Sequence, residues 1–355
     1  GGPWRRAGAD QRAFGFTRPP YFDLLEAEHR AFRERVGIID MSSFGKIEVE
    51  GAGARALLER VAGNRIDRPV GTVVYTQLLE PGGGIAADVT VTRLSPDHFR
   101  VVTGAGYVNS DLGWLRMQVL ETEPPVRLRE SSDELAVIGT WGPSSRDVLE
   151  QVTHDDVSEP GFPFMTAREI RIGGAKVLAQ RVTYVGELGW ELYVQPSWAV
   201  QVWDSLMRAG RALGIRPGGY RVLDSLRMEK GYRYYGTDMG LLENPYEAGL
   251  GFAVDRQKWG AIPREVTRRL RTLAIGGDEY LPVYGGEAVH HDGRVAGRLR
   301  SCAYGFTVRK NLAYSYLPTE LRPGAQVEVE VFGHLVPATV SPDAVLAKRE
   351  EQPAR

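Results

Sequence analysis

The sequence predicts an α+β protein, in which a mixed helix and strand region precedes a small antiparallel β-barrel. Before about residue 272, helical and strand-like segments mix without a regular strand–helix–strand rhythm, which disfavours a doubly wound parallel sheet. From 273 to 340, short alternating runs are separated by turns such as Asp292-Gly293 and Phe332-Gly333, which is typical of a small barrel. We therefore expect four parts: an arm at 1–20, a main domain at 21–272, a barrel domain at 273–345 and a tail at 346–355.

The elements of the first half follow from their periodicity. Apolar residues at helical spacing predict helices at 24–36, at 54–62, from about 109 and from about 144. Alternation and short apolar runs predict strands at 46–50, 73–79, 89–94, 99–103 and 135–139. Gly37–Asp40 is expected to end the first helix and to lead into the first of these strands.

The elements of the second half begin with a predicted hairpin. Its strands are expected at 176–184 and 190–194, across a turn that contains two glycines. Helices are predicted at 199–213 and 221–230, and Gly231 would cap the C-terminal end of the second helix.

The composition argues against several classes of function. The chain has 355 residues with 44 Lys+Arg against 45 Asp+Glu, so it lacks the excess positive charge that nucleic acids and anionic membranes attract. At about 150 residues per domain, the length suits roughly two domains. No run approaches the ~18 apolar residues of a membrane span. The single cysteine, Cys302, cannot form an internal disulfide, which favours a reducing, cytoplasmic setting.

Dinucleotide and metal sites find little support. The segment 51–56 reads G-A-G-A-R-A and formally matches a dinucleotide fingerprint, but the strand before it alternates Ile47 and Val49 with charged residues, unlike a buried parallel strand. We interpret 51–56 as a tight strand-to-helix turn and expect no nicotinamide or flavin in this chain. The six His residues do not stand at metal-ligand spacing, so no metal site is expected.

Asp88 is the first candidate for chemistry. It follows the glycines of Gly82-Gly83-Gly84 and is the only carboxylate between Glu80 and Asp97. A carboxylate held where the backbone approaches closely could be a partly desolvated general base. Taken alone, Asp88 would more often be an ordinary turn residue.

Glu191 and Arg227 are the other two candidates. Glu191 shares one strand face with Tyr193, while Trp190 faces the other side; its carboxylate could accept paired N–H groups of an amino-heterocycle, or could form a cross-strand salt bridge. Arg227 could equally be half of an i,i+3 ion pair with Asp224 on its helix.

Together these segments resemble the tetrahydrofolate-dependent aminomethyltransferase superfamily of the glycine-cleavage T-protein. The form of the segments is closest to the folate-binding portion of dimethylglycine and sarcosine dehydrogenases. The resemblance covers about residues 21 to 345. It rests on ordered motifs: I-D-M-S-S-F-G-K at 39–46, Y-T at 75–76, G-G-I-A-A-D-V-T-V-T-R-L at 83–94, Y-V-G-E-L-G-W-E-L-Y at 184–193, S-L-R-M-E-K-G-Y-R at 225–233 and E-A-G-L-G-F-A-V at 247–254.

This resemblance implies a fold, a cofactor and roles for residues. The fold would be a three-part, cloverleaf-like folate domain around a central channel, followed by the barrel. The ligand would be tetrahydrofolate, or its 5,10-methylene or 5-methyl form. Asp88 would be the catalytic carboxylate and Glu191 would hold the pterin ring. Arg227 would continue the pterin site, and Tyr75 and Tyr184 would line the same pocket.

The dehydrogenases of this superfamily carry an N-terminal FAD-binding oxidase domain, whereas here only an arm precedes the folate portion. The resemblance therefore implies that this chain alone does not oxidise an amine. A separate flavoprotein would deliver an iminium, or the donor would be a methyl group already activated for transfer, or the chain would be part of a longer flavoenzyme. The one-carbon donor would be a small methylated amine or another small methyl donor.

Three functions remain open on the sequence. The leading hypothesis is an enzyme that moves a methyl or methylene group between such a donor and tetrahydrofolate. A non-catalytic folate-binding protein is disfavoured because relatives of that kind carry Lys-Gly-Cys, whereas Lys230-Gly231 is followed here by Tyr232. A stabilising subunit of a separate flavoprotein amine oxidase is the third, and an intact Asp88 argues against it.

A basic run stands near the expected domain boundary. It comprises Arg264, Arg268, Arg269 and Arg271. These side chains could meet the glutamate tail of a folate, although a solvated helix face is the simpler interpretation.

Overall fold

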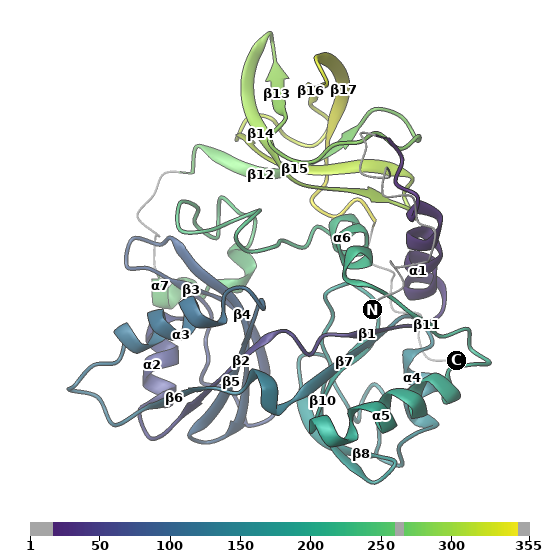
Figure 1. Cartoon of the computed structure of the whole chain (residues 1–355). Helices are drawn as coiled ribbons and strands as arrows, with labels where there is room; N and C mark the ends of the chain where they lie inside the picture. Colours follow the sequence, from purple (N-terminus) through teal and green to yellow (C-terminus); the bar gives the residue numbers. More distant parts are fainter. Residues whose placement is uncertain (1–16, 260–265, 347–355) are drawn as a thin grey trace.

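The structure, a computed structural model, describes residues 17–259 and 266–346 (Figure 1). Within these residues the chain forms an α+β fold of three lobes, two built on open sheets and the third a closed barrel. The fold class predicted from the sequence is therefore confirmed. Most of the expected arm, Arg264 and most of the expected tail lie outside the described residues.

The first lobe is an antiparallel five-stranded sheet with helices on one side. Its core joins the inner faces of the strands to α2 and α3, and includes Ile47, Leu57 and Leu112. In spatial order the strands are β3 (Val73–Leu79), β4 (Ile85–Ser95), β5 (His98–Thr103), β2 (Gly45–Glu50) and β6 (Arg127–Glu130), and the helices are α2 (Ala54–Val61) and α3 (Val108–Met117).

The strand-to-helix turn between β2 and α2 is confirmed as a tight turn. Gly51 has a φ of +113°, a conformation that L side chains rarely adopt, and a Cβ on Gly53 would lie 2.1 Å from the carbonyl oxygen of Pro124. The strand before the turn pairs antiparallel with β5 and β6. The glycines are thus explained by backbone geometry.

The second lobe is a six-stranded sheet that is antiparallel except at one edge, where β1 pairs parallel with β11. One face packs on α4 and α5, and the other faces α6 in the middle of the molecule. In spatial order the strands are β11 (Arg216–Pro217), β1 (Gly37–Asp40), β7 (Ala136–Trp141), β10 (Gly189–Val194), β9 (Ala175–Gln180) and β8 (Ala167–Ile172), and the helices are α4 (Ser145–Glu150) and α5 (Pro196–Ala209).

The expected hairpin of β9 and β10 is antiparallel, but its first strand ends at Gln180 rather than at Tyr184. The connection is a loop, in which the Thr183 Oγ1 accepts hydrogen bonds from the backbone N–H groups of Val185, Gly186 and Glu187 at 2.9–3.2 Å. A side chain that caps three amides holds the chain out of the sheet. Tyr184 is therefore carried on a loop and not on a strand.

The third lobe is the predicted barrel, closed by six antiparallel strands. Its first strand begins at Arg268, so the boundary expected at 272/273 falls inside β12. In spatial order the strands are β12 (Arg268–Ile275), β15 (Lys310–Pro318), β14 (Arg294–Gly305), β13 (Ala288–His291), β16 (Gln326–Val331) and β17 (His334–Ser341).

Helices α1 (Phe22–Glu34) and α6 (Tyr220–Glu229) lie below the barrel in Figure 1 and join the second lobe to it. A buried ion-pair network makes this join. Arg33 of α1 donates through Nε to the Glu229 carboxylate of α6 at 3.2 Å and through Nη1 to Glu187 at 3.1 Å. Glu229 also accepts the backbone N–H of Thr307, in the loop between β14 and β15, at 2.8 Å. Short pieces complete the fold: η2 (Ser132–Glu134), η3 (Gly251–Ala253) and α7 (Arg256–Trp259).

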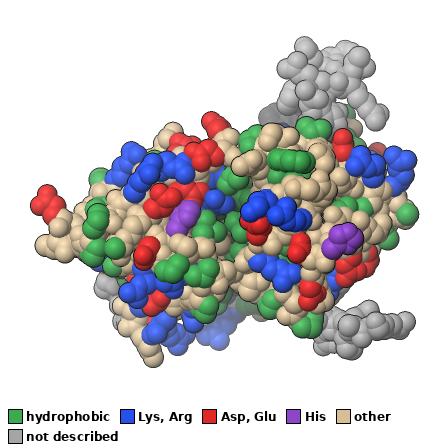
Figure 2. Space-filling model, turned by 90° about the horizontal axis from the view of Figure 1, so that it is seen from below, with side chains coloured by type: hydrophobic (Ala, Val, Ile, Leu, Met, Phe, Trp, Pro, Cys, Tyr) green, Lys and Arg blue, Asp and Glu red, His purple; other side chains and the backbone are tan. Residues whose placement is uncertain are grey.

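The surface agrees with the near-zero net charge. On the face seen from below, Lys and Arg side chains lie among Asp and Glu side chains (Figure 2). Among the described residues, no helix is long and apolar enough to cross a membrane.

Candidate functional site

Asp88 lies on β4 and not in a turn, so the ordinary-turn interpretation is wrong. Across the sheet it faces Gln77 of β3, and Tyr75 lies two residues earlier on the same face of that strand. The Gln77 Nε2 donates to Asp88 Oδ1 at 2.8 Å, and the Tyr75 hydroxyl also donates to the Asp88 carboxylate. Two neutral donors therefore orient the carboxylate without neutralising it.

Burial raises the pKa of Asp88 to about 6, although the hydrogen bonds from Gln77 and Tyr75 oppose this shift. The side chain nevertheless keeps some contact with the molecular surface. A carboxyl with a pKa near 6 is ionised at neutral pH and is a stronger base than an exposed Asp. This residue has the protonation behaviour that a general base needs.

Burial is the main reason why the pKa values of the Tyr75 and Tyr184 hydroxyls are raised. Both tyrosines also lie close enough to Asp88 for its negative charge to raise these pKa values further. Tyr75 stacks on Phe252 with ring centroids 6.2 Å apart. Tyr184 stacks on Tyr232 at 6.3 Å, and its hydroxyl donates to the carbonyl of Arg233 at 2.8 Å. Two tyrosines thus lie near the carboxylate, and each stacks on a further aromatic ring.

Arg227 is buried on α6, and most of its donors are used within the chain. Its Nε donates to Asp224 at 2.9 Å, which confirms the i,i+3 pair, and its Nη1 donates to Asp238 and to the carbonyl of Tyr232, both at 3.0 Å. Its Nη2 donates to Ser301 of the barrel at 2.9 Å. These partners use four of the five N–H groups of a guanidinium and leave one on Nη2.

Glu191 stands on the inner face of β10, where the Tyr193 hydroxyl donates to its Oε2 at 2.7 Å. Burial raises the pKa of Glu191, while the Tyr193 hydrogen bond and the charge of Lys46 lower it. Its partners across the sheet are Gly139 and Gln180, neither of them cationic. The cross-strand salt bridge considered above is therefore wrong.

The structure divides the five residues expected at the site into a group of four and Glu191. Asp88, Tyr75 and Tyr184 share one electrostatic environment, and the charge of Arg227 lowers the pKa of Tyr184. Within 17–259 and 266–346, no hydrogen bond or ion pair joins Glu191 to these four. Two exposed tyrosines lie near these residues. The Arg227 guanidinium lies 5.6 Å from the centroid of the Tyr234 ring. Burial raises the pKa of Tyr220, and the charges of Asp40 and Glu191 raise it further.

The basic run lies on a strand, so its interpretation as a helix face is wrong for the three described arginines. On β12, Arg268 pairs with Glu243 at 3.3 Å and with Glu247 at 3.4 Å. Arg269 lies 3.7 Å from Asp343. Arg268 and Arg269 thus already face carboxylates of the chain itself, and the glutamate tail of a folate would compete with these carboxylates.

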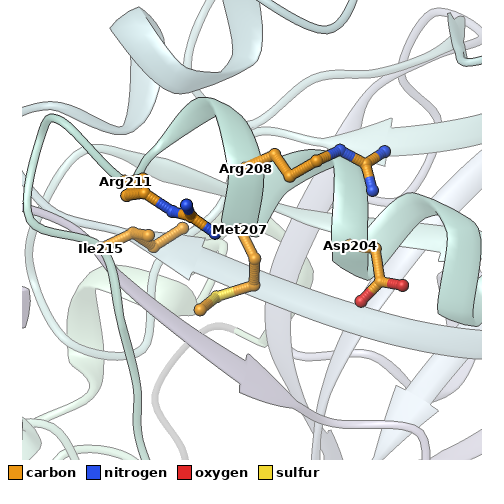
Figure 3. Close-up of a pocket in the computed structure, with 5 residues that line it drawn as sticks. All are labelled: Asp204, Met207, Arg208, Arg211 and Ile215. Carbon is orange, nitrogen blue, oxygen red and sulfur yellow. The ribbon is translucent and has the colours of Figure 1, made fainter.

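Two hollows lie away from Asp88. The larger, about 340 Å³, opens on the outer side of α5 and is lined by Asp204, Met207, Arg208, Arg211 and Ile215 (Figure 3). The smaller, about 140 Å³, adjoins the Arg33 and Glu187 ion pair. No expected site residue lines either hollow. In the described part of the chain, no group of three or more His, Cys, Asp or Glu side chains is arranged to hold a metal ion.

Gln77 contacts Asp88 and Arg233 acts electrostatically on Tyr75, and the sequence interpretation singled out neither as a site residue. Gln77 alternates with Tyr75 on β3, so the two-residue period of a strand could have placed it beside Asp88. Arg233 is buried, lies over the Tyr314 ring at 4.7 Å and lowers the pKa of Tyr75. Its segment is irregular, so no local periodicity predicts where its side chain points.

Comparison with known proteins places the chain in a family. Residues 4–258 match the GCVT N-terminal domain, and residues 268–345 match the glycine cleavage T-protein C-terminal barrel domain. The mitochondrial dimethylglycine dehydrogenase of Rattus norvegicus is 35% identical over 336 residues, 92% of this chain and 39% of that protein. An aminomethyltransferase of Halothermothrix orenii is 37% identical over 245 residues, 69% of this chain and 67% of the relative.

The fold has a close counterpart among solved structures. The glycine cleavage system aminomethyltransferase T of Bartonella henselae superposes with a TM-score of 0.81 at 23% identity, covering 93% of this chain and 91% of that one. The chain spans about two fifths of the length of the mammalian dehydrogenases it matches. The resemblance inferred from the sequence is confirmed: the chain belongs to the glycine-cleavage T-protein family of aminomethyltransferases.

Proposed function

We propose that this chain transfers a methyl or methylene group between a small methylated substrate and tetrahydrofolate. One observation supports this proposal above the others: Asp88, oriented by Gln77 and Tyr75, has its pKa raised to about 6 among aromatic side chains. Family membership supports one-carbon transfer as the reaction class, while the donor and the folate form are part of the proposal.

The proposed chemistry needs one proton acceptor. When bound, folate supplies a nitrogen that accepts the one-carbon unit. Asp88 would take up the proton that leaves this nitrogen as the new carbon–nitrogen bond forms. In methylene transfer, the π electrons of the donor iminium would pass to the donor nitrogen. In methyl transfer, the bond between the methyl carbon and the donor would break and its electron pair would stay with the donor. Gln77 and Tyr75 keep the carboxylate aimed during the step, because each donates to it. Holding two reactants in one site can itself lower a barrier by ~7–11 kcal/mol, so few catalytic groups suffice.

The chain's own residues fit a reduced pterin. Glu191 has one carboxylate oxygen held by Tyr193, and a carboxylate is acceptor-only, so it matches the paired N–H groups of an aminopyrimidinone ring. Tyr75 and Tyr184 offer ring faces for stacking. Arg227 would hold the 232–238 segment and the barrel in place, and its remaining Nη2 hydrogen could reach the ligand.

The one-carbon donor is a small methylated amine or another small methyl compound in this proposal. Dimethylglycine and sarcosine are the first candidates, because several of the relatives that match about nine tenths of this chain are named for them. A flavoprotein partner or domain would oxidise the amine, and this chain would bind no flavin. The single cysteine supports a reducing compartment such as the cytoplasm.

The experiment measures folate binding and carbon transfer separately. Calorimetry under anaerobic conditions would give the affinity for tetrahydrofolate. Methyl-labelled dimethylglycine would then be supplied with and without a flavoprotein amine oxidase, and labelled folate would be quantified. Faster label transfer in the presence of this chain supports the proposal. Folate binding without any effect on labelled product would instead favour a non-catalytic or stabilising subunit, and no folate binding would refute both.

A further inference from the structure

One buried side chain beside Glu191 has no partner. Gln180, the last residue of β9, has no exposed surface, and neither its Nε2 nor its Oε1 makes a hydrogen bond within the described residues. Both ends are unpartnered, so exchanging the two atoms by turning the amide would not remove the problem. A buried amide without partners is unfavourable, so its presence calls for an explanation.

The sheet register places Gln180 next to Glu191. The two residues are direct partners in the antiparallel β9–β10 pair, so their side chains project from the same face with Cβ atoms about 4.5–5.5 Å apart. On the other side of Glu191 stands Gly139, which carries no side chain and is covered by the Trp141 indole. The polar groups in this row of the sheet are therefore Glu191 and Gln180.

That face is the inner one. Tyr193, which shares it, packs in a core cluster with Leu226 of α6 and with Val102 of the first lobe. The opposite face carries Trp190 and Leu192, which pack under α4 and α5. Gln180 therefore points to the same interior side as the carboxylate that we assign to the pterin, although nothing in the sheet itself requires an amide there.

The chemistry of a reduced pterin matches an amide beside a carboxylate. Its pyrimidinone edge presents an amino N–H and a ring N–H side by side, which a carboxylate can accept. On either side of this donor pair the ring system carries an acceptor followed by a further ring N–H. A carboxamide offers one donor group and one acceptor, so it complements either side. Glu191 alone satisfies only the central donor pair.

We propose that Gln180 binds the reduced pterin together with Glu191, its Nε2 donating to the ring acceptor next to the donor pair and its Oε1 accepting the following N–H. This inference rests on the proposed function. Gln180 would thereby recognise the ring acceptor that Glu191 cannot contact. A ligand partner would also explain why an unpartnered amide is buried in this sheet.

The test compares two apolar replacements of orphaned polar groups. Gln180→Met keeps approximate length and removes both polar atoms. Thr140→Val is the matched control, because the Thr140 hydroxyl is also buried and unpartnered but belongs to β7 and pairs across the sheet with Trp190 on the opposite face. Calorimetry with tetrahydrofolate and thermal unfolding without ligand would be measured for wild type and both variants.

We expect both variants to keep or raise the unfolding temperature of the ligand-free protein, since each removes an unsatisfied buried group. Gln180→Met should weaken tetrahydrofolate binding about tenfold, the effect of roughly one lost net hydrogen bond, while Thr140→Val should leave the dissociation constant unchanged. Gln180→Leu, which removes both polar atoms with a shorter side chain, should weaken binding by a similar factor. This second variant replaces Gln180→Met in the binding test if Gln180→Met does not fold.

Three outcomes would overturn the inference, and only one of them also removes the proposed function. If wild type and Gln180→Met bind tetrahydrofolate equally, Gln180 is not a ligand residue, whereas the proposed function stands. If the wild-type protein binds no tetrahydrofolate, the proposed function fails and takes this inference with it. Equal weakening in Gln180→Met and Thr140→Val would also refute it, because the effect would then come from packing of the sheet.

Discussion

At the scale of single residues, the decisive group is Asp88. Asp88→Asn keeps the shape of the side chain and one acceptor oxygen, but replaces the other oxygen with an NH2 donor and removes the charge and the basicity. If Asp88 accepts the proton, one-carbon transfer should fall by ~10²–10⁴ while folate affinity changes little. Stopped-flow or discontinuous measurement of labelled folate, with calorimetry beside it, would show the split. Near-normal turnover at saturating substrates would remove Asp88 from the mechanism.

Glu191→Gln should give the opposite pattern. The amide presents a donor to the pterin where a carboxylate presents only acceptors, so folate affinity should drop at least tenfold. Turnover at saturating folate should fall less than in Asp88→Asn, because Glu191 does not exchange the proton. The two variants would be compared at equal fractional saturation. A variant that binds folate as wild type does would show that Glu191 is a structural partner of Tyr193 only.

The raised pKa of Asp88 predicts a pH dependence with a definite sign. The base is active when ionised, so turnover should decline tenfold per pH unit below about pH 6. The contribution of Asp88 to the free energy of unfolding should change in the opposite direction, and it is larger at low pH. The folded pKa exceeds the unfolded one, so the contribution of Asp88 to folding is present below about pH 4 and is lost as the pH rises through 6.

Asp88→Asn provides the control for both pH effects. Its residual turnover should lack the acid limb, and its stability relative to wild type should be greater at pH 8 than at pH 4. Denaturant unfolding at the two pH values would measure the second effect. An acid limb that persists in the variant would have to come from another group, of which Glu191 is the first candidate because burial also raises its pKa.

Residue patterns identified Asp88, Glu191 and Arg227 only as separate candidates, and it was the family resemblance that grouped them in one site. Asp88 was predicted from its glycine-rich approach and Glu191 from the face it shares with Tyr193, and both lie on strands with Tyr75 and Tyr193 as hydrogen-bond partners. What brings Tyr184 beside Asp88 is contact between two lobes that lie about a hundred residues apart in the chain. Local periodicity does not contain that information.

At the scale of helices and strands, the agreement between the sequence prediction and the structure depends on the length of the element. Most helices and strands of six or more residues in the first two lobes were predicted within a few positions, although β8 was missed. The short β6 and β11 were also missed, and β1 was expected as a turn. β11 has two residues and exists only because it pairs with β1, so no alternation could reveal it. Helix α5 begins at Pro196 rather than at 199, since proline suits the first turn of a helix, a cue that apolar spacing alone does not use.

Gly231 provides a test at this scale. It ends α6 with a φ of +74°, and its N–H bonds the carbonyl of Met228, as predicted for a C-terminal cap. A Cβ there would lie 2.4 Å from the carbonyl oxygen of Asp343. Gly231→Ala should therefore reduce the free energy of unfolding by at least about 1 kcal/mol, through both the left-handed backbone and the contact.

Gly277→Ala is the matched control for this change. Gly277 has no atom within 4 Å of its added Cβ and does not have a positive φ, so its substitution should alter stability by less than about 0.5 kcal/mol. Chemical denaturation of both variants would measure the difference. Equal free energies of unfolding for the two variants would contradict the prediction. They would mean that the end of α6 and the chain near Asp343 can move apart with little loss of stability.

At the scale of the whole molecule, the site depends on how the lobes meet. The carboxylate of Asp88 belongs to the first sheet and that of Glu191 to the second, while Arg227 of α6 reaches Ser301 in the barrel. A shared core supports this arrangement, since Val102 of β5 packs in the same cluster as Tyr193 of β10 and Leu226 of α6. A ligand that contacts both carboxylates would therefore stabilise the join and not one lobe alone.

This arrangement predicts a distributed response to folate. Tetrahydrofolate at a hundred times its dissociation constant should stabilise the protein by about 2.7 kcal/mol, and amide hydrogen exchange should slow in β4 and β10 together. Exchange would be followed by mass spectrometry at matched saturation in wild type and in Glu191→Gln. The variant at equal ligand concentration should lose protection in both strands, because its occupancy falls throughout the site. Protection confined to β4 would mean that folate contacts the first lobe only, and the pterin assignment of Glu191 would then be wrong even if Asp88 remained the base.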